Sequence, residues 1–401
     1  MLNKDRSTLI TLTIVFSILI SVVCGCTKPS QGPILEAPPV NPEPESIVVE
    51  VAAVGDFLMH MPVINAAWDN NIGKYDFASQ LNPVKSLLAK PDLTIANLET
   101  RLAGQNNGGY SGYPVFNCPE QLAYDLKAVG IDVVTTANNH SLDRGFSGLL
   151  TTLDNLEAAG LKPVGNYRTM EERKVPLIID VKGIKIGILN YTDSVNGIPI
   201  PAGKEYAINM VDLEKINNDI QQLKSAGSDV IIMYLHFGIE YQRYPNEQQK
   251  QLVDQLFAMG IDIIFGDHVH VIQPMEKRSI NFAGQDKEVF VIYSLGNFIS
   301  NQRWQYSDSG VIVNIQLEKH PATNITTITK VDYVPTWVHT YLANGKKHYR
   351  VVAVEKAMRD YEQQLDATIT PSDYQRLQQV WLETTSHLTK VGQNILPRTI
   401  Q

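Results

Sequence analysis

The sequence has little cysteine, which limits the covalent structure of its folded part. Only three cysteines occur in 401 residues, and Cys24 and Cys26 both lie at the end of an N-terminal apolar run. Cys118 is therefore the single cysteine of the remaining chain, and no disulfide can form within that part. Because unpaired cysteines are among the most buried residues in proteins, we expect Cys118 to be a small apolar residue of the core.

Basic residues are also scarce, since 34 Lys and Arg stand against 42 Asp and Glu and the net charge is −8. Residues 1–25 carry +1, so the rest of the chain carries −9. An acidic body argues against a nucleic-acid partner, because neutralising phosphates requires Lys and Arg. With 44% hydrophobic and 19% charged residues the composition is globular, and the length fits one large domain or two smaller ones.

A long uninterrupted apolar run is missing as well. The run over residues 9–23 contains two threonines and two serines, and it is shorter than the roughly 20 apolar residues of a spanning helix. Behind a basic start it is typical of a secretory signal, and the sequence VCGC resembles a lipobox with Cys26 as the lipidated residue. We expect residues 1–25 to be a lipoprotein signal peptide, with an uncleaved anchor helix as the alternative. Both place the body on the extracytoplasmic face of the cell membrane.

Residues 26–47 contain six prolines, and such a stretch favours extended polyproline II over a packed core. We expect it to tether the lipid anchor to the folded part. One main domain is predicted over residues 48–345, with a pair of antiparallel strands at 310–334. A helical extension that packs on the domain is predicted over residues 346–401, where Pro371 occupies a first helical position.

One pattern occurs three times in the body. A helix ends at a glycine, a short apolar strand follows, and histidine comes after the strand; the helices are expected at 119–129, 212–226 and 247–259. Continuous apolar strands separated by helices predict an α/β fold with parallel pairing and both sheet faces covered. In such sheets functional sites form beyond the carboxyl ends of the strands, so the three units indicate one site.

The side chains at the strand ends are of the kind that binds metals. Six of them follow strands: Asp56, Glu99, His140, His236, His268 and His270. A single histidine in such a place is more often structural, but four histidines with two carboxylates favour a site for Zn, Fe or Mn. Two histidines spaced i and i+2 on an extended segment point to the same side, so His268 and His270 are expected to share the site.

Further polar residues near these strand ends each have two interpretations. Asn139 supplies an amide oxygen as a neutral ligand or forms a turn, and the same holds for Asn138. Asp143 either caps the following helix or orients His140 through a carboxylate–imidazole contact. Glu240 is either a general base or a solvated charge of a surface loop.

Six motifs in this order resemble the CapA (PgsA) family. They are VGD ending at Asp56, ANLE ending at Glu99, ANNHSLDRG at 137–145, HFGIEY at 236–241, GDHVHVIQ at 266–273 and SLGNF at 294–298. The resemblance covers residues 48–300, and members of this family take part in making or exporting capsular poly-γ-glutamate. It therefore implies an anionic polymer such as poly-γ-glutamate, and membrane synthase or export subunits, as partners.

The CapA family is in turn similar to the calcineurin-like metallophosphoesterases. This resemblance implies a four-layer α-β-β-α sandwich of the metallophosphoesterase type, with a site for one or two divalent ions such as Mn, Fe or Zn. It implies His140 as the catalytic histidine. The metal ligands that it implies are Asp56, Glu99, Asn139, His236, His268 and His270.

The chain departs from the superfamily pattern at several positions. Leu58 stands where a ligand is expected, and His60 lies two residues further on. Glu99 replaces an aspartate, Ser141 replaces an acid, and Asn117 stands where the CapA family implies a basic residue. These departures leave one ion short of a ligand and put phosphatase activity in doubt.

Two functions from different classes follow from these features. One is a metal-dependent hydrolase in which His140, Asp143 and Glu240 are catalytic and the substrate is a phosphoester or the amide of polyglutamate. The other is a non-catalytic binding or scaffold role in a polymer synthase or export complex, where a divalent ion bridges the acidic chain to the polyanion. A surface receptor for a small peptide is a third, weaker alternative.

Overall fold

The computed structural model describes residues 45–389 and 395–400, which belong to one compact unit, Pro44–Gln401. The predicted signal peptide, the predicted lipidation site Cys26 and nearly all of the predicted tether lie outside the described residues. Among the helices of the described part, none has the length and apolar character needed to cross a membrane.

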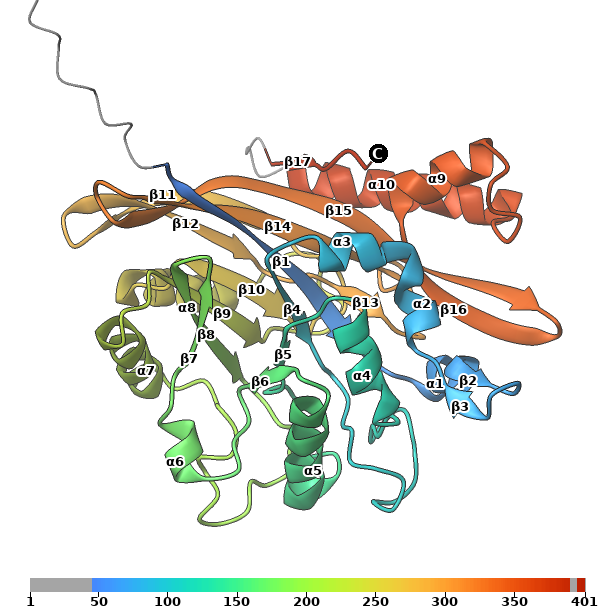
Figure 1. The fold of residues 1–401 in the computed structure, drawn as a ribbon, viewed down its shortest axis with the longest axis horizontal. Coiled ribbons are helices and arrows are strands. Elements are labelled where there is room, and N and C mark those ends of the chain that lie inside the picture. The colour runs from blue at the N-terminus through green and yellow to red at the C-terminus, as the bar shows by residue number, and fades with distance from the viewer. Residues whose placement is uncertain (1–44, 390–394, 401) are drawn as a thin grey trace, which may run out of the picture. The chain divides into compact units, whose positions relative to one another are not determined.

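Two β-sheets form the frame of this unit (Figure 1). The first contains, in spatial order, β16 (Lys346–Ala353), β15 (Ile325–Ala343), β14 (Ser309–His320), β1 (Ile47–Phe57), β4 (Leu93–Asn97), β5 (Val133–Thr135) and β6 (Lys162–Val164). In addition, β13 (Asn297–Ile299) pairs with β1, and β17 (Leu396–Pro397) pairs with β15. The strands β1, β4, β5 and β6 are parallel, whereas β14 is antiparallel to β1, β15 to β14 and β16 to β15.

The second sheet has a parallel centre and antiparallel edges. Its spatial order is β11 (Met275–Phe282), β12 (Gln285–Ile292), β10 (Ile263–Asp267), β9 (Val230–His236), β8 (Ile184–Thr192) and β7 (Leu177–Val181). The edge strands β11 and β7 are antiparallel, and the four between them are parallel. A separate two-stranded ribbon joins β2 (Trp68–Asp69) to β3 (Lys74–Tyr75).

Alternate side chains of the central strands face different layers. In β1, Val51 and Ala53 pack into the core between the sheets, whereas Ala52 and Val54 pack against helices on the outer face. The first sheet is covered by α1 (Met61–Ala67), α2 (Ala78–Leu81), α3 (Lys85–Ala89) and α4 (Gln121–Ala128), and the second by α7 (Leu213–Ser225) and α8 (Glu247–Met259). The predicted four-layer α-β-β-α sandwich is confirmed, and burial on both faces explains the continuous apolar strands.

The three predicted helix–strand units are present in the structure. α4 leads to β5, α7 to β9 and α8 to β10, and each strand pairs in parallel with a neighbour. Between β5 and β6 the chain forms α5 (Gly145–Ala158). α8 begins with a capping box at Asn246 and ends at Gly260, whose φ of 111° favours glycine. These crossovers bring the carboxyl ends of the parallel strands to one edge.

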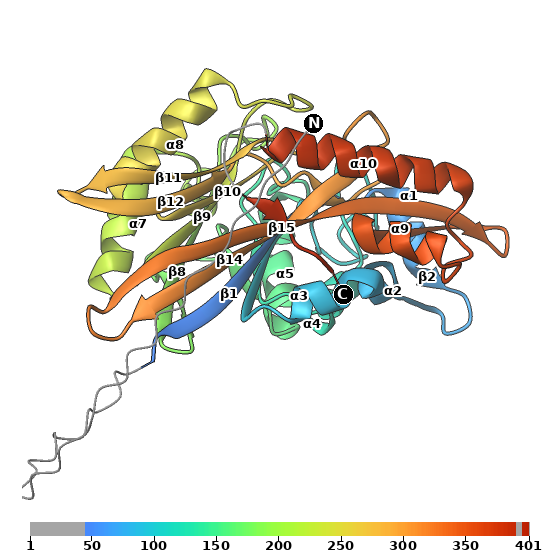
Figure 2. The ribbon, with the colours of Figure 1, turned by 90° about the horizontal axis from the view of Figure 1, so that it is seen from above.

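The C-terminal part starts with a strand, not with a helix. Residues Lys346–Ala353 form β16 and pair with β15 from Thr336 to Ala343, so the predicted boundary at residue 346 falls within a hairpin. The helices follow as α9 (Val354–Glu362) and α10 (Pro371–Thr389), which starts at the predicted proline. Leu377 of α10 is buried against Trp337 of β15, and Figure 2 shows α10 lying along that strand.

Two glycines permit the close approach of neighbouring backbones just before acidic residues. A Cβ atom at Gly55 would lie 2.0 Å from the carbonyl oxygen of Gly296, and one at Gly266 would lie 2.0 Å from that of Tyr293. Neither contact is tolerated by real Cβ atoms, and both neighbours are backbone atoms of a packed sheet. Only glycine therefore lets these strand ends lie as close as they do.

We predict that Gly266→Ala lowers the free energy of unfolding by about 2–3 kcal/mol, because the strands must separate to admit a methyl group. Urea denaturation of both proteins measures this change. Gln285→Ala, on an exposed residue of the same sheet, is the control and should stay within about 0.5 kcal/mol of the parent. A Gly266→Ala variant as stable as the control would contradict the steric account.

Candidate metal centre

The carboxyl ends of strands from both sheets meet at one place. Asp56 lies in β1, Glu99 follows β4, and Asn139 and His140 follow β5 of the first sheet. From the second sheet, the last residues of β9 and β10 and the loop after β10 contribute His236, Asp267, His268 and His270. Each sheet thus supplies part of the site, as expected for a site beyond strand ends.

The six predicted ligands converge. His270 Nδ1 lies 3.1 Å from Asp56 Oδ2 and 3.8 Å from Glu99 Oε2. His236 Nε2 lies 3.4 Å from Glu99 Oε1 and 3.0 Å from Asn139 Oδ1. The rings of His236 and His268 are 4.8 Å apart between centroids. Five of the six are buried and His268 is partly exposed, so these side chains line a nearly closed centre.

Three overlapping sets of side chains have ligand atoms within 4.8 Å of one another. They are Glu99, His236 and His268; Asp56, Glu99 and His270; and Asp56, His236 and Asp267. Asp267 was not predicted as a ligand, although the sequence places it after an apolar strand and a glycine, as it places Asp56. This repeated strand–Gly–Asp pattern is the signal that would have identified it.

Buried polar atoms without hydrogen-bond partners indicate that the centre is built for a cation. Both carboxylate oxygens of Glu99, both of Asp267, and Nδ1 of His268 are buried and lack a partner among the described residues. Unpartnered buried oxygens are unfavourable unless a ligand supplies the missing interaction. A donor set of carboxylate and imidazole with one amide suits a divalent ion such as Zn, Fe or Mn, and these residues fit such an ion.

The burial of these groups perturbs their protonation. Burial raises the pKa of Glu99 well above its ordinary value of 4.5, and the neighbouring Asp56 and Asp267 raise it further. Burial, followed by repulsion from Asp56, likewise raises the pKa of Asp267. Burial lowers the pKa of His236 well below 6.5 and that of His268 to about 4, and nearby imidazoles add to both shifts. The two imidazoles are therefore neutral, which is the form that binds metals.

The backbone that presents His268 and His270 differs from the prediction. β10 ends at Asp267, and the two histidines have φ angles of 89° and 60°, so the expected extended segment is wrong. Both rings nevertheless reach the centre, with centroids 6.2 Å apart. Positive φ is unfavourable for residues with a Cβ atom, and such strain concentrates at functional sites.

His140 lies beside the centre and is oriented by a carboxylate. Its Nδ1 lies 2.8 Å from Asp143 Oδ2, and the same oxygen accepts a hydrogen bond of 2.7 Å from the backbone N–H of Phe116. The Phe116 ring packs edge-on against His140 at 4.7 Å between centroids. Asp143 does not cap α5, whose N-cap residue Arg144 makes no side-chain cap. Of the two interpretations of Asp143, the structure shows the carboxylate–imidazole contact that orients His140.

Glu240 lies on the exposed surface near the mouth of the centre. Burial raises the pKa of the adjacent Tyr241, and the charge of Glu240 raises it further. The Tyr241 ring stacks on Trp304 at 5.7 Å and lies 6.0 Å from His270. Glu240 thus belongs to the rim of the site, not to its buried group of ligands.

The residues that depart from the family and superfamily patterns pack in the core or hold backbone segments in place. Leu58 is a buried core residue. His60 packs edge-on against Phe116 at 5.3 Å, and burial lowers its pKa to about 4. The Ser141 hydroxyl bonds to backbone groups, and Asn117 holds a loop through Ala103 N, Gly104 O and Gly109 O. Asn117 therefore organises its loop, and Cys118 beside it is buried as predicted.

Asparagines fix the inner wall of the centre. Asn97 Nδ2 donates to Asp56 Oδ1 at 2.7 Å. Asn138 Nδ2 donates to Leu98 O at 2.8 Å, and its Oδ1 accepts from the backbone N–H of His140 at 3.1 Å. Asn138 therefore holds the loops that carry the ligands, whereas Asn139 faces the centre.

Arg101 is a fully buried cation that sequence reasoning missed. Its guanidinium donates to four neutral acceptors, Leu98 O, Thr136 O, Asn138 Oδ1 and Asn166 Oδ1, at 3.1–3.4 Å. Burial lowers its pKa to about 10, while Asp143 and Glu99 oppose this shift, so it stays charged at neutral pH. It joins the loops after β4 and β5 and places a positive charge behind the carboxylates.

The fold and this centre define a four-layer α/β protein with a buried carboxylate–histidine site. The model of the family described as bacterial capsule synthesis protein PGA_cap matches residues 50–302, and the chain belongs to this family. It is 31% identical over 209 residues to the PGA biosynthesis protein CapA of Bacillus subtilis strain 168, a match that covers 52% of each chain. It is 25% identical over 287 residues to the capsule biosynthesis protein CapA of Bacillus anthracis, covering 70% of this chain and 66% of that one.

The matched regions span about half and about two thirds of these two relatives. Solved structures with a similar chain path include a phosphatase from Mycoplasma pneumoniae, at 14% identity and a TM-score of 0.42, covering 73% of this chain and 94% of that one. Another is the NAD nucleotidase of Haemophilus influenzae, at 13% identity and a TM-score of 0.44. This match covers 85% of this chain and 60% of the nucleotidase chain. Because both TM-scores are below 0.5, the fold is assigned from the strand order of this chain and not from these structures.

We predict that the purified chain binds a divalent ion and that Glu99→Gln weakens this binding at least about 100-fold, because Glu99 belongs to two of the three ligand sets. Isothermal titration with Mn²⁺ and Zn²⁺ measures the affinities. The matched control Glu240→Gln removes an equal charge from the exposed rim and should bind within about threefold of the parent. Equal loss in both variants would show that the cluster is not the binding site.

Without metal, Glu99→Gln should be more stable than the parent, and the difference should grow as pH rises above 4.5. The raised pKa means that folded Glu99 holds its proton more tightly than the unfolded residue, so ionisation at higher pH lowers the stability of the parent only. The difference is at most about 1.4 kcal/mol per pH unit for one group. Urea denaturation of both proteins in EDTA from pH 4.5 to 7.5 measures this difference in stability. A difference that is independent of pH would show that the pKa of Glu99 is not raised in the folded protein.

Proposed function

We propose that this chain acts in the synthesis, release or export of poly-γ-glutamate capsule through a metal-dependent hydrolytic site. Membership of the PGA_cap family and the names of the two Bacillus relatives support the capsule role. The observation that carries the hydrolytic part is the convergence of three buried carboxylates and three imidazoles, in which the oxygens of Glu99 and Asp267 lack hydrogen-bond partners among the described residues. A bound cation would stabilise the ionised form of these carboxylates, which is otherwise disfavoured because burial raises the pKa of Glu99 and Asp267.

A bound divalent ion would supply Lewis acidity for a carbonyl or phosphoryl oxygen and would activate water. Its ligands would be carboxylate oxygens and imidazole nitrogens of Asp56, Glu99, Asp267, His236, His268 and His270, with Asn139 as a neutral ligand. His140 is the residue that transfers protons. Since the carboxylate of Asp143 accepts from Nδ1, the proton sits on that nitrogen and Nε2 is the atom that serves the substrate.

Proton transfer is assigned to His140 rather than to Glu240. The His140 ring is held on one side by Asp143 and on one face by Phe116, so its direction is fixed before substrate arrives. Glu240 is exposed on a loop and has no comparable support. Its charge at the rim instead adds to the negative field that attracts a cation to the centre.

The substrate we propose is the γ-glutamyl amide of the polymer. The departures at Leu58 and Ser141 remove groups that phosphoester chemistry in the wider superfamily implies, and neither side chain substitutes for them. Beyond residue 25 the chain carries a net charge of −9 and repels a polyanion, so the ion would also bridge protein and polymer. Lipidation at Cys26 would hold the site at the extracytoplasmic face of the membrane, beside synthase or export subunits.

A binding or scaffold role is the second candidate, because a cation held by the buried carboxylates would offset the repulsion between the acidic chain and the polyanion. A bridging ion alone would let the centre hold the polymer without bond cleavage. The two candidates differ in what they require of His140, because bridging needs the ligands but no proton transfer. Capsule formation that survives Glu99→Ala combined with His268→Ala in cells would remove both roles from the centre.

We predict that His140→Gln lowers kcat at least about 100-fold and leaves metal content unchanged, because the ring transfers protons without belonging to the ligand sets. Asp143→Asn should lower kcat by a smaller factor, since the ring stays but loses its orientation. The assay follows cleavage of γ-glutamyl oligopeptides, and of a phosphodiester for comparison, by the Mn²⁺-, Fe²⁺- or Zn²⁺-loaded full chain. Absence of turnover by the parent with every ion would reject the hydrolase and leave the binding role.

A further inference from the structure

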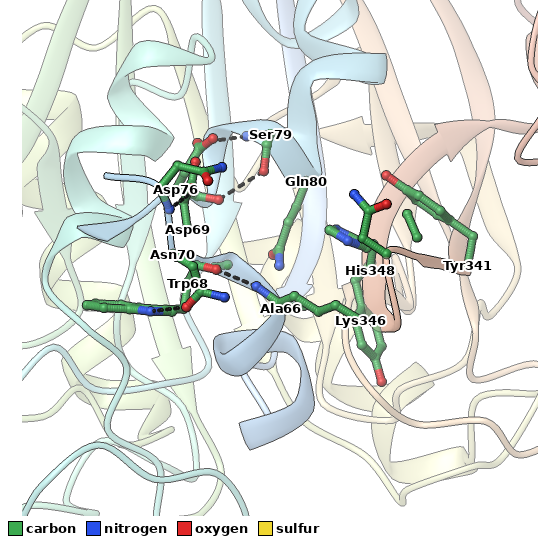
Figure 3. Close-up of a pocket in the computed structure, with 15 residues that line it drawn as sticks. Ala66, Trp68, Asp69, Asn70, Asp76, Ser79, Gln80, Tyr341, Lys346 and His348 are labelled. Atoms are coloured by element: carbon green, nitrogen blue, oxygen red, sulfur yellow. Dashed lines mark hydrogen bonds between the residues drawn. The ribbon is translucent and has the colours of Figure 1, made fainter. Parts of the chain in front are cut away.

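A second cavity lies outside the metal centre, and none of the centre's residues lines it. We call it the hairpin pocket, because one wall is the tip of the β15–β16 hairpin and the other is the chain from α1 through β2 to α2 (Figure 3). Its volume is about 440 Å³. This volume lies within the range of small-molecule sites, which is about 300–1,000 Å³.

Gln80 supplies a polar atom that has no hydrogen-bond partner in the described part of the chain. Its side chain is 3% exposed, and Nε2 donates to Val63 O at 2.9 Å, but the buried Oε1 accepts no hydrogen bond from the described residues. Figure 3 shows Gln80 reaching between Asn70 on one wall and His348 on the other. An unpartnered buried carbonyl is unfavourable, and a donor from a bound molecule would satisfy it.

The walls are polar but carry little net charge. Two carboxylates hold their own turns, since Asp69 Oδ1 accepts from Asn71 N at 2.7 Å and Asp76 Oδ1 accepts from Ser79 N at 3.0 Å. Lys346 donates to the backbone oxygen of Trp68 and ties the hairpin tip to β2. With two carboxylates and one engaged lysine, the pocket does not favour a polyanion, and its many amides do not favour an apolar ligand.

Aromatic rings complete the pocket. Tyr341 and His348 stack on each other at 5.1 Å between centroids with an interplanar angle of 16°, and both line the cavity from the hairpin. Flat rings of this kind pack against the C–H faces of a ligand, while amides and carboxylates around them bind groups that both donate and accept hydrogen bonds. A hydroxyl-rich ring with an apolar face meets both conditions.

We propose that the hairpin pocket binds a neutral saccharide, one or two sugar rings in length. The His348 ring, which Tyr341 backs by stacking on it, supports the C–H face, and the Gln80 carbonyl accepts from a hydroxyl or acetamido N–H. Asn70 and Asn344 bind the remaining hydroxyls from the pocket mouth. This site is independent of the metal centre and of the chemistry proposed there.

The test titrates the purified full chain with two neutral probes, a tetramer of N-acetylglucosamine and a tetramer of glucose, by calorimetry and saturation-transfer NMR. We expect at least one probe to bind, with an affinity that Tyr341→Ala and Gln80→Leu each reduce at least tenfold. Tyr374→Ala, which removes a tyrosine from α10, is the matched control and should leave the affinity within twofold. EDTA should leave binding unchanged, because no ion takes part.

The outcomes separate this site from the one proposed for the polymer. No binding of either probe, or binding that both pocket variants leave unchanged, would overturn the proposal. Binding of a γ-glutamate oligomer at the hairpin pocket in place of the saccharides would overturn it as well. Because Gln80 is buried, thermal melting must first show that Gln80→Leu is folded. If it is not, the variant Tyr341→Ala, at a half-buried residue of the hairpin, decides the result.

Discussion

Asp56, Glu99 and Asp267 are buried together where the carboxyl ends of the two sheets meet, and their mutual repulsion is the constraint on which the centre depends. Among the described residues, Glu99 and Asp267 have no hydrogen-bond donors on their carboxylate oxygens, and the imidazoles of His236 and His268 are neutral. Arg101 places one positive charge behind them but forms its hydrogen bonds with neutral acceptors. A divalent cation would remove this repulsion, and its binding would then be linked to local stability.

The fold holds the carboxylates in this arrangement at many points. Gly55 and Gly266 let the strand ends approach, and Asn97 and Asn138 tie the ligand loops to the sheet and to one another. The histidines after β10 keep positive φ angles, which the surrounding packing must maintain. Because these supports come from both sheets, the packing of the sandwich and the geometry of the centre are not separable.

The α/β class and most of the centre could be predicted from local pattern, whereas the four-layer sandwich and the ligand role of Asn139 were implied by the resemblance to metallophosphoesterases. Apolar strands between glycine-terminated helices identify the units that end in His140, His236 and His268. The path of the backbone after β10 could not be predicted, since i and i+2 spacing does not distinguish an extended segment from one with positive φ. Arg101 was missed because a basic residue in a loop is normally solvated, and only the tertiary structure shows that its partners are buried carbonyls.

The most direct test of this account is anomalous diffraction from crystals of the chain grown with Mn²⁺ or Zn²⁺. The account predicts an anomalous peak within about 2.3 Å of a Glu99 oxygen and of an imidazole nitrogen of His236, His268 or His270. A fully occupied peak only at surface carboxylates, or an ordered centre without any ion at saturating metal, would contradict it.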